Sequence, residues 1–346
     1  MHLLSYATVL LLPLLCVPAL LLGGAWAWLL PLVVFGLVPL AELFLPGTRR
    51  NYGEQEEASR RASRAYDGLL YLSSAQMLTI GALMLAVGPT LSGAALLGAS
   101  LSVGICFGAI GINVAHELGH RTASLPRLTA RGLLVLVAYP HFRVEHNRGH
   151  HARVATPEDP ASARRGESLY PFWLRSISGG LASAWSLERQ RLEGAGQSVW
   201  SLRNEVLSGW LAVVGLWALI GLLAGPVALA MFVGAGLVAV LLLETVNYVE
   251  HYGLGRQSTG PGRYERTQPR HSWNSERPIG RVLLFELTRH SDHHAFPARP
   301  YAVLRHHDEA PELPTGYPGM ILLALLPPLY RRVMESALVE QARAAA

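Results

Sequence analysis

Residues 3–45 read LLSYATVLLLPLLCVPALLLGGAWAWLLPLVVFGLVPLAELFL, and this stretch decides the fold. It consists of two apolar runs, 3–22 and 25–45, separated only by Gly23 and Gly24. Because a helix of about 20 apolar residues crosses a hydrocarbon core about 30 Å thick, the stretch predicts two membrane spans. A cleaved signal peptide is the alternative for the first run, but that run lacks a basic leading region and a second run follows at once.

Four further apolar runs have a similar length, in a chain of 346 residues that is 51% hydrophobic. We therefore expect an all-α integral membrane protein with six transmembrane helices. The polar segments between and after the later runs are expected to form a histidine-rich cap. The expected spans are 3–22, 25–45, 69–87, 91–115, 206–224 and 227–248.

Arginine predicts the orientation, because basic residues in short loops stay on the cytoplasmic side. The loop between the second and third spans contains Arg49, Arg50, Arg60, Arg61 and Arg64, whereas the turns after the first, third and fifth spans carry no charge. Both termini and the cap are therefore expected on the cytoplasmic side of the membrane. The expected plan is one domain, with spans one to four in 1–120, a cytoplasmic cap in 121–205, two spans in 206–252, and a second cap with an interfacial C-terminal segment in 253–346.

The remaining composition excludes several kinds of chemistry. All 29 basic residues are arginine, so a lysine Schiff base is excluded. The net charge of +5 fits the retention of arginine in cytoplasmic loops, and nothing in the sequence indicates nucleic-acid binding. Cys16 and Cys106 lie inside apolar runs with no CxxC motif, so no iron–sulfur site is expected and electrons must come from another protein.

Nine of the fourteen histidines fall into the clusters HELGH at 116–120, EHNRGHH at 145–151, EHYG at 250–253 and RHSDHH at 289–294. Imidazole is the commonest protein metal ligand, and ligands three or four residues apart lie on one helix face, where a single ion can meet both. Nine ligands exceed the four to six that one ion accepts, so the pattern indicates a dinuclear centre. The candidate ligands are His116, His120, His146, His150, His151, His251, His290, His293 and His294.

Two alternative functions and the identity of the metal stay open at this point. HELGH also matches HExxH, the motif of zinc proteases, although that function needs only one further ligand and leaves the other clustered histidines unused. A metal carrier predicts polar residues along the spans, which are nearly absent. The ligands themselves do not name the metal, because zinc, copper and nickel also bind imidazole well.

Carboxylates and amides beside the candidate ligands are expected to fix the orientation of the imidazole rings. A carboxylate that accepts the second ring N–H of a ligand histidine sets its tautomer, and an amide one helical turn away is placed for the same task. The candidates for this supporting role are Asn113, Glu117, Glu145, Asn247, Glu250 and Asp292.

The clusters HELGH, EHNRGHH, NYVEHYG and LTRHSDHHA resemble those of the membrane-bound alkane 1-monooxygenases, relatives of the membrane fatty acid desaturases and hydroxylases. Stretches such as VATPEDPA, LERQRL and LPTGYPG are similar to the same family, so the resemblance covers residues 40–335. The HYG motif at 251–253 is typical of alkane hydroxylases. Phe296 departs from the family pattern, because a histidine is expected there.

The resemblance implies two non-haem irons held by the nine histidines, and O₂-dependent hydroxylation of n-alkanes to primary alcohols. It implies electrons from rubredoxin, a separate chain here because none is fused, and indirectly from rubredoxin reductase. A xylene-type methyl hydroxylase, or a fatty-acyl hydroxylase or desaturase, is the alternative on the same scaffold. The alkane is expected to enter from the bilayer, through a tunnel bordered by Val34 and Phe35 on the second span.

Overall fold

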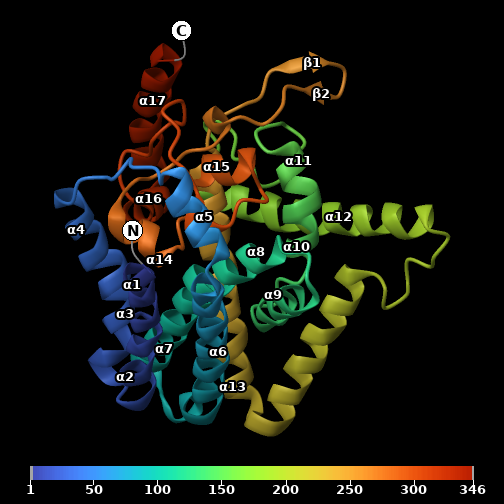
Figure 1. Cartoon of the computed structure of the whole chain (residues 1–346). Coiled ribbons are helices and arrows are strands. Elements are labelled where there is room, and N and C mark those ends of the chain that lie inside the picture. The colour runs from blue at the N-terminus through green and yellow to red at the C-terminus, as the bar shows by residue number, and fades with distance from the viewer. Residues whose placement is uncertain (1–2, 345–346) are drawn as a thin grey trace. The chain divides into compact units, whose positions relative to one another are not determined.

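The computed structural model describes residues 3–344, and most of them are helical (Figure 1). The chain divides into two compact units. Unit 1 comprises residues 1–36, 64–147 and 181–243, and unit 2 comprises residues 37–63, 148–180 and 244–346.

Unit 1 contains the long apolar helices. The N-terminal segment winds through short helical pieces, and the helices that follow are longer and more regular. Its elements are α1 (Leu3–Ala7), η1 (Thr8–Leu11), η2 (Pro13–Leu15), α2 (Cys16–Leu21), η3 (Gly24–Trp28), α3 (Leu29–Leu32), α6 (Arg64–Val87), η5 (Gly88–Thr90), α7 (Gly93–Cys106), η6 (Phe107–Ile112), α8 (Asn113–Gly119), α9 (Ser124–Leu136) and α10 (Phe142–Val144).

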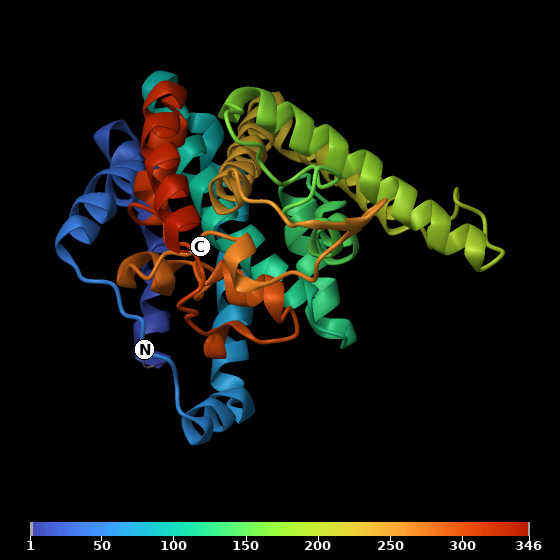
Figure 2. The same cartoon turned by 90° about the horizontal axis from the view of Figure 1, so that it is seen from above.

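Four of the described elements begin in one unit and end in the other. They are η4 (Val33–Leu37), η7 (Glu145–His150), α12 (Leu169–Gly194) and α13 (Glu205–His251). Figure 2 shows α12 as one long helix followed by the loop that leads into α13.

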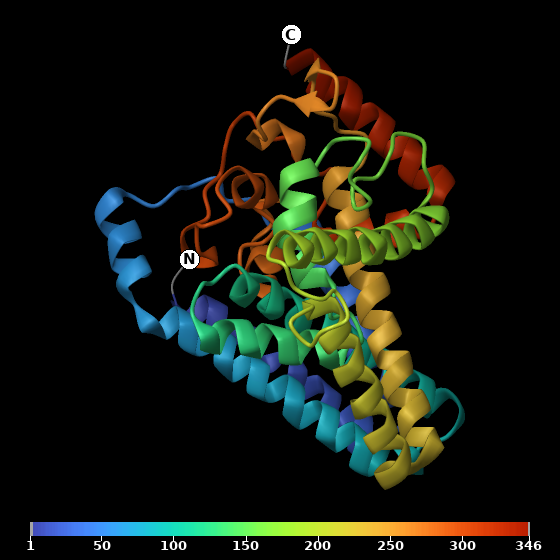
Figure 3. The same ribbon diagram turned by 90° about the vertical axis from the view of Figure 1, so that its right-hand side faces the viewer.

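Among residues 3–344, five helical segments are long and apolar enough to cross a membrane: Leu3–Leu21, Gly24–Phe44, Arg64–Thr90, Gly93–Gly119 and Glu205–His251. The fifth has 47 residues and is broken at Gly225, where φ is 84° and Pro226 follows. Figure 3 shows its two halves doubling back as a hairpin. The two last expected spans, 206–224 and 227–248, lie on either side of this break.

Small residues let helices of unit 1 approach closely. A Cβ atom at Gly104 would lie 2.6 Å from the side chain of Val238, and one at Gly108 would lie 3.1 Å from the backbone of Ala239. Glycine is therefore required where α7 and η6 meet the second half of α13, as is common between helices in membranes. Cys16 and Cys106 are buried free thiols whose sulfur atoms lie 3.5 Å apart, so they pack as apolar side chains.

Unit 2 contains several short helices and irregular polar segments. Its helices α16 and α17 pack against each other, α4 packs against α14 and α16, and α15 packs against η8. Its elements are α4 (Val38–Phe44), α5 (Glu54–Ala62), α11 (His151–Arg153), β1 (Ser258–Gly260), β2 (Arg263–Tyr264), η8 (Pro269–His271), α14 (Pro278–Leu283), α15 (His290–Ala295), η9 (Tyr301–Val303), α16 (Tyr317–Ala324) and α17 (Pro327–Ala344). The two strands pair as an antiparallel hairpin.

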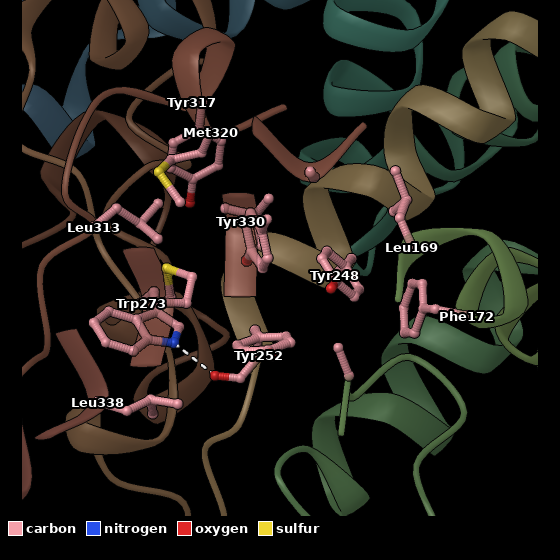
Figure 4. Packing of buried hydrophobic residues seen from close by; sticks show 14 residues of the cluster. Leu169, Phe172, Tyr248, Tyr252, Trp273, Leu313, Tyr317, Met320, Tyr330 and Leu338 are labelled. Atoms are coloured by element: carbon pink, nitrogen blue, oxygen red, sulfur yellow. Dashed lines mark hydrogen bonds between the residues drawn. The ribbon is translucent and has the colours of Figure 1, made fainter. Parts of the chain in front are cut away.

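An aromatic core forms beneath the end of α13 in unit 2 (Figure 4). Tyr248, Tyr252 and Tyr330 have ring centroids 5.0–5.4 Å apart, and the indole N–H of Trp273 donates to the Tyr252 carbonyl at 2.9 Å. These side chains are almost fully buried, so they hold the last turn of α13 in place.

A buried ionic network fixes the N-terminal part of unit 2. Arg289 is fully buried, lies 3.0 Å from the Glu276 carboxylate, and donates to the carbonyls of Thr48 and Arg50 at 3.1 Å. Arg281 lies 3.2 Å from the same carboxylate. Two arginines around one carboxylate, with carbonyl acceptors for the remaining N–H groups, satisfy the charges in a buried position.

Candidate metal centre

The HELGH motif places two histidines at the end of α8, and a third joins them from η7. The Nε2 atom of His116 lies 3.3 Å from that of His120 and 2.6 Å from that of His146. Because His116 and His120 are four residues apart, they share a helix face. Phe142 stacks on the His146 ring at 5.0 Å, which fixes its plane. These three histidines are called the triad of unit 1.

His120 is the least deeply buried member of the triad, yet its ring is neutral near pH 7. Burial, together with the charge of the adjacent Arg121, lowers the pKa of His120 to about 4. A neutral imidazole keeps a lone pair for a metal, so the triad is chemically a set of three nitrogen donors.

Four histidines of unit 2 converge in a second group, the four-histidine cluster: His150, His251, His290 and His294. All four are buried, and their ligand atoms lie within 4.8 Å of one another. Neighbouring Nε2 atoms are 3.2 Å apart between His150 and His294 and between His251 and His290, and 2.8 Å apart between His290 and His294.

The spacing of the four-histidine cluster fits one transition-metal ion. Nitrogen ligands about 2 Å from a tetrahedral ion lie about 3.3 Å from each other. Lone pairs on four neutral rings repel at this distance unless a cation or proton lies between them. Burial, and secondarily the neighbouring rings, hold the pKa of His294 well below its ordinary value, so protons are poor candidates for that role.

The remaining two candidate ligands, His151 and His293, form a pair in unit 2 with their Nε2 atoms 3.0 Å apart. On α15, His290 and His294 point to the four-histidine cluster, whereas His293 points to His151. In the structure, His290 and His294, which are four residues apart, therefore lie on one helix face, as their spacing predicts.

The same prediction is wrong for His146 and His150. These residues lie in η7, a π-type turn in which hydrogen bonds join residues five apart. His146 joins the group of His116 and His120, whereas His150 joins the four-histidine cluster.

A carboxylate supports the four-histidine cluster from behind. Asp159 accepts a hydrogen bond from His150 Nδ1 at 2.8 Å and another from the Ser162 hydroxyl at 2.6 Å. Burial acts to raise the pKa of Asp159, but His150 and Ser162 outweigh it, so the pKa lies below its ordinary value. An ionised carboxylate on the second ring nitrogen orients a ligand histidine and increases its basicity. Sequence reasoning missed Asp159, although it lies in the quoted stretch VATPEDPA.

Glu250 is the expected supporting residue that lies nearest to the four-histidine cluster. One oxygen lies 3.2 Å from His290 Nε2, and the other accepts a hydrogen bond from Tyr317 at 2.8 Å. The carboxylate is thus on the ligand side of the ring, where it can meet a bound cation directly.

The other expected supporting residues have different surroundings. Asp292 accepts hydrogen bonds from Arg299, from His307 at 2.6 Å and from the Arg305 backbone at 3.0 Å. None of these three donors is one of the nine candidate ligands. Asn247 donates to Glu244 at 3.3 Å, and Glu117 pairs with Arg121 at 2.7 Å. Asn113 and Glu145 are buried in unit 1.

Three further positions singled out in the sequence are Phe296, Val34 and Phe35. Phe296 is exposed, and the guanidinium of Arg299 lies over the Phe296 ring, 4.5 Å from the ring centroid. Val34 is buried and Phe35 is partly buried in η4, a second π-type segment. Such segments are common at functional sites, which makes η4 a suitable place for a tunnel residue.

Membrane-length helices that carry converging buried imidazoles define a class of membrane-embedded histidine-rich proteins able to bind metal. Comparison with known proteins agrees with this class, because the family model described as fatty acid desaturase matches residues 92–323.

The similar curated proteins are mostly alkane 1-monooxygenases. Alkane 1-monooxygenase 2 of Pseudomonas aeruginosa is 44% identical over 90% of this chain and 84% of that relative. Alkane 1-monooxygenase 1 of Alcanivorax borkumensis is 42% identical over 92% of this chain and 79% of that relative. The xylene/toluene monooxygenase hydroxylase component of Pseudomonas putida is 30% identical over 89% of this chain and 81% of that relative. The chain belongs to the alkane 1-monooxygenase family.

Proposed function

We propose that this chain hydroxylates the terminal methyl group of n-alkanes to primary alcohols, using O₂ at a non-haem di-iron centre. The observation that carries the proposal is the four-histidine cluster, a buried set of nitrogen donors with the spacing of one metal site. Alkane 1-monooxygenases at 42–44% identity support the substrate class.

The nine histidines are the proposed ligands of two irons. The four-histidine cluster supplies one complete ligand set. When bound, the irons supply the activation of O₂ that organic side chains lack. Iron rather than zinc is proposed because the reaction of the family requires a redox metal, whereas imidazoles alone accept either ion.

The protein residues around the ligands perform three tasks in this proposal. Asp159 orients His150 through its Nδ1 hydrogen bond. Glu250 places a buried carboxylate against the metal side of His290, where it balances the charge of a bound cation. Burial of all four rings of the cluster excludes bulk water, which limits side reactions of activated oxygen.

The proposed membrane arrangement is based on the apolar runs and arginine positions of the sequence. We propose six spans, counting the two halves of α13 separately, with both termini and the metal centre on the cytoplasmic side of a bacterial inner membrane. The alkane is already dissolved in lipid, so its entry between helices gains little hydrophobic free energy, and tunnel shape decides chain length. Electrons are proposed to come from rubredoxin, which rubredoxin reductase reduces.

A xylene-type methyl hydroxylase is the second candidate, because one relative at 30% identity has that name. The test supplies the purified chain with rubredoxin, its reductase, NADH and ¹⁸O₂, and offers octane and m-xylene in parallel. Formation of 1-octanol that contains ¹⁸O, at a rate well above that of methylbenzyl alcohol, supports the alkane reaction. Preference for xylene would overturn it, and loss of both products without O₂ is the control.

A further inference from the structure

A surface depression of about 370 Å³ lies in unit 2, next in sequence to ligands of the four-histidine cluster. Residues 155–157 and 162–165 form one wall, and they follow His150 closely along the chain. Residues 253–256 form the other wall and follow His251 directly. Ser258 and Tyr264, from the hairpin β1–β2 that Figure 1 labels, also line the depression.

The two walls are joined by main-chain hydrogen bonds. The Gly253 amide donates to the Ala163 carbonyl at 3.0 Å, and the Arg256 amide donates to the Ala155 carbonyl at 2.8 Å. The Arg256 guanidinium adds bonds to the carbonyls of Ala152 at 2.9 Å and Glu265 at 2.7 Å. The depression is therefore preformed, and binding there requires little ordering of the backbone.

Three arginines line the depression. Its lining includes Arg164, Arg165 and Arg256, and no carboxylate. Arg165 pairs with Glu335 at the exposed edge, whereas Arg164 is exposed and forms no ion pair with any residue between 3 and 344. The Arg164 backbone amide donates to the Glu167 carboxylate at 2.9 Å, and that carboxylate is ion-paired with Arg175. The exposed Arg164 guanidinium can therefore still meet an acidic partner, and such complementarity raises association rates.

The wall that contains Ser162 connects to the four-histidine cluster by hydrogen bonds. Ser162 lines the depression and donates to Asp159 at 2.6 Å, and Asp159 accepts from His150 Nδ1 at 2.8 Å. Two hydrogen bonds thus lead from the surface to a ligand ring of the cluster. One-electron transfer is faster along a short continuous path of covalent and hydrogen bonds than across empty space.

From these observations we propose that this arginine-lined depression is the docking site for an acidic surface of the soluble one-electron carrier protein. The inference rests on the proposed function, in which the carrier is rubredoxin. Each turnover consumes one alkane, one O₂, two electrons and two protons, and yields one alcohol and one water. The carrier delivers one electron per docking event, so it docks twice in each turnover.

The test is charge reversal at Arg164, which contacts no candidate ligand. Arg164→Glu is compared with Arg332→Glu, a matched reversal at an exposed arginine of α17. The rate of octane hydroxylation by the full chain in detergent is measured against rubredoxin concentration at low and high salt. We expect Arg164→Glu to raise the KM for rubredoxin about tenfold at low salt, with unchanged kcat and iron content. High salt is expected to reduce the difference.

Two further measurements separate docking from catalysis. Hydroxylation driven by dithionite and a small uncharged mediator bypasses docking, so it is expected to be equal in all three proteins. Direct binding of rubredoxin to the immobilised chain is expected to weaken for Arg164→Glu alone.

An unchanged KM and unchanged rubredoxin binding in Arg164→Glu would overturn the docking site. Weaker binding to phosphatidylglycerol vesicles, with normal rubredoxin kinetics, would also overturn it and assign the depression to anionic lipid. If no donor supports hydroxylation but rubredoxin binding still depends on Arg164, the proposed function fails and the docking site stands.

Discussion

Replacement of Asp159 by asparagine tests whether the carboxylate behind His150 tunes the metal site. Asp159 is buried and accepts from His150 at 2.8 Å and from Ser162 at 2.6 Å. Loss of such a partner typically costs ten- to hundredfold in metal affinity, or about 1.4–2.7 kcal/mol. The asparagine amide keeps one acceptor but no charge, so we expect about tenfold for Asp159→Asn. Asp159→Ala leaves His150 and Ser162 without this partner, and we expect about a hundredfold loss.

The assay is competition for ferrous iron between the detergent-solubilised chain and a chelator of known affinity, under anaerobic conditions. Glu158→Gln is the matched control, because it removes the charge of the adjacent exposed carboxylate. Thermal unfolding of the metal-free proteins checks that each variant retains its fold. Equal iron affinity for wild type, Glu158→Gln and Asp159→Asn would refute the role assigned to Asp159.

Three other predictions concern the tunnel, the ligands and the stability of the protein. Val34→Trp is expected to shorten the longest alkane hydroxylated, because Val34 is buried. Leu37→Trp is the control, because Leu37 is 56% exposed in the same segment. An unchanged product range of Val34→Trp on gas chromatography would exclude Val34 from the tunnel. His251→Ala is expected to lower iron content and abolish hydroxylation together, while His141→Phe retains both; full activity of His251→Ala would remove His251 from the ligand set. Burial lowers the pKa of His141 to about 4, so the unfolded state binds the extra proton and acid destabilises the fold progressively between pH 6.5 and pH 4. The loss at pH 5 is about 2 kcal/mol, and His141→Phe should show a smaller drop in unfolding temperature between pH 7 and pH 5; an equal drop would contradict the assignment.

Apolar run length and turn chemistry were sufficient to predict much of the helical framework. The runs predicted from composition coincide closely with the long apolar helices, since span length is set by the bilayer rather than by tertiary contacts. Gly225 and Pro226 predicted a turn, and the helix α13 breaks there because Gly225 adopts a positive φ. The shared face of His290 and His294 also followed from helix geometry.

The features that escaped prediction depend on local winding or on distant contacts. His146 and His150 join different groups although they lie four residues apart in η7, and no residue type in EHNRGH marks this π-type turn. Asp159 reaches His150 through the irregular segment after α11, so no periodic pattern connects the two. Arginines 49–64 predicted topology alone, yet Arg60 is buried over the Tyr52 ring and donates to the Ala302 carbonyl.

The central claim is that the clustered histidines hold two irons, and metal content tests it most directly. The chain is purified in detergent without chelators, and iron, zinc and copper are measured by elemental mass spectrometry. The account predicts two irons per chain, with a loss of iron in His294→Ala and none in His141→Phe. One zinc per chain without iron would contradict the di-iron centre and restore the membrane protease hypothesis for HELGH.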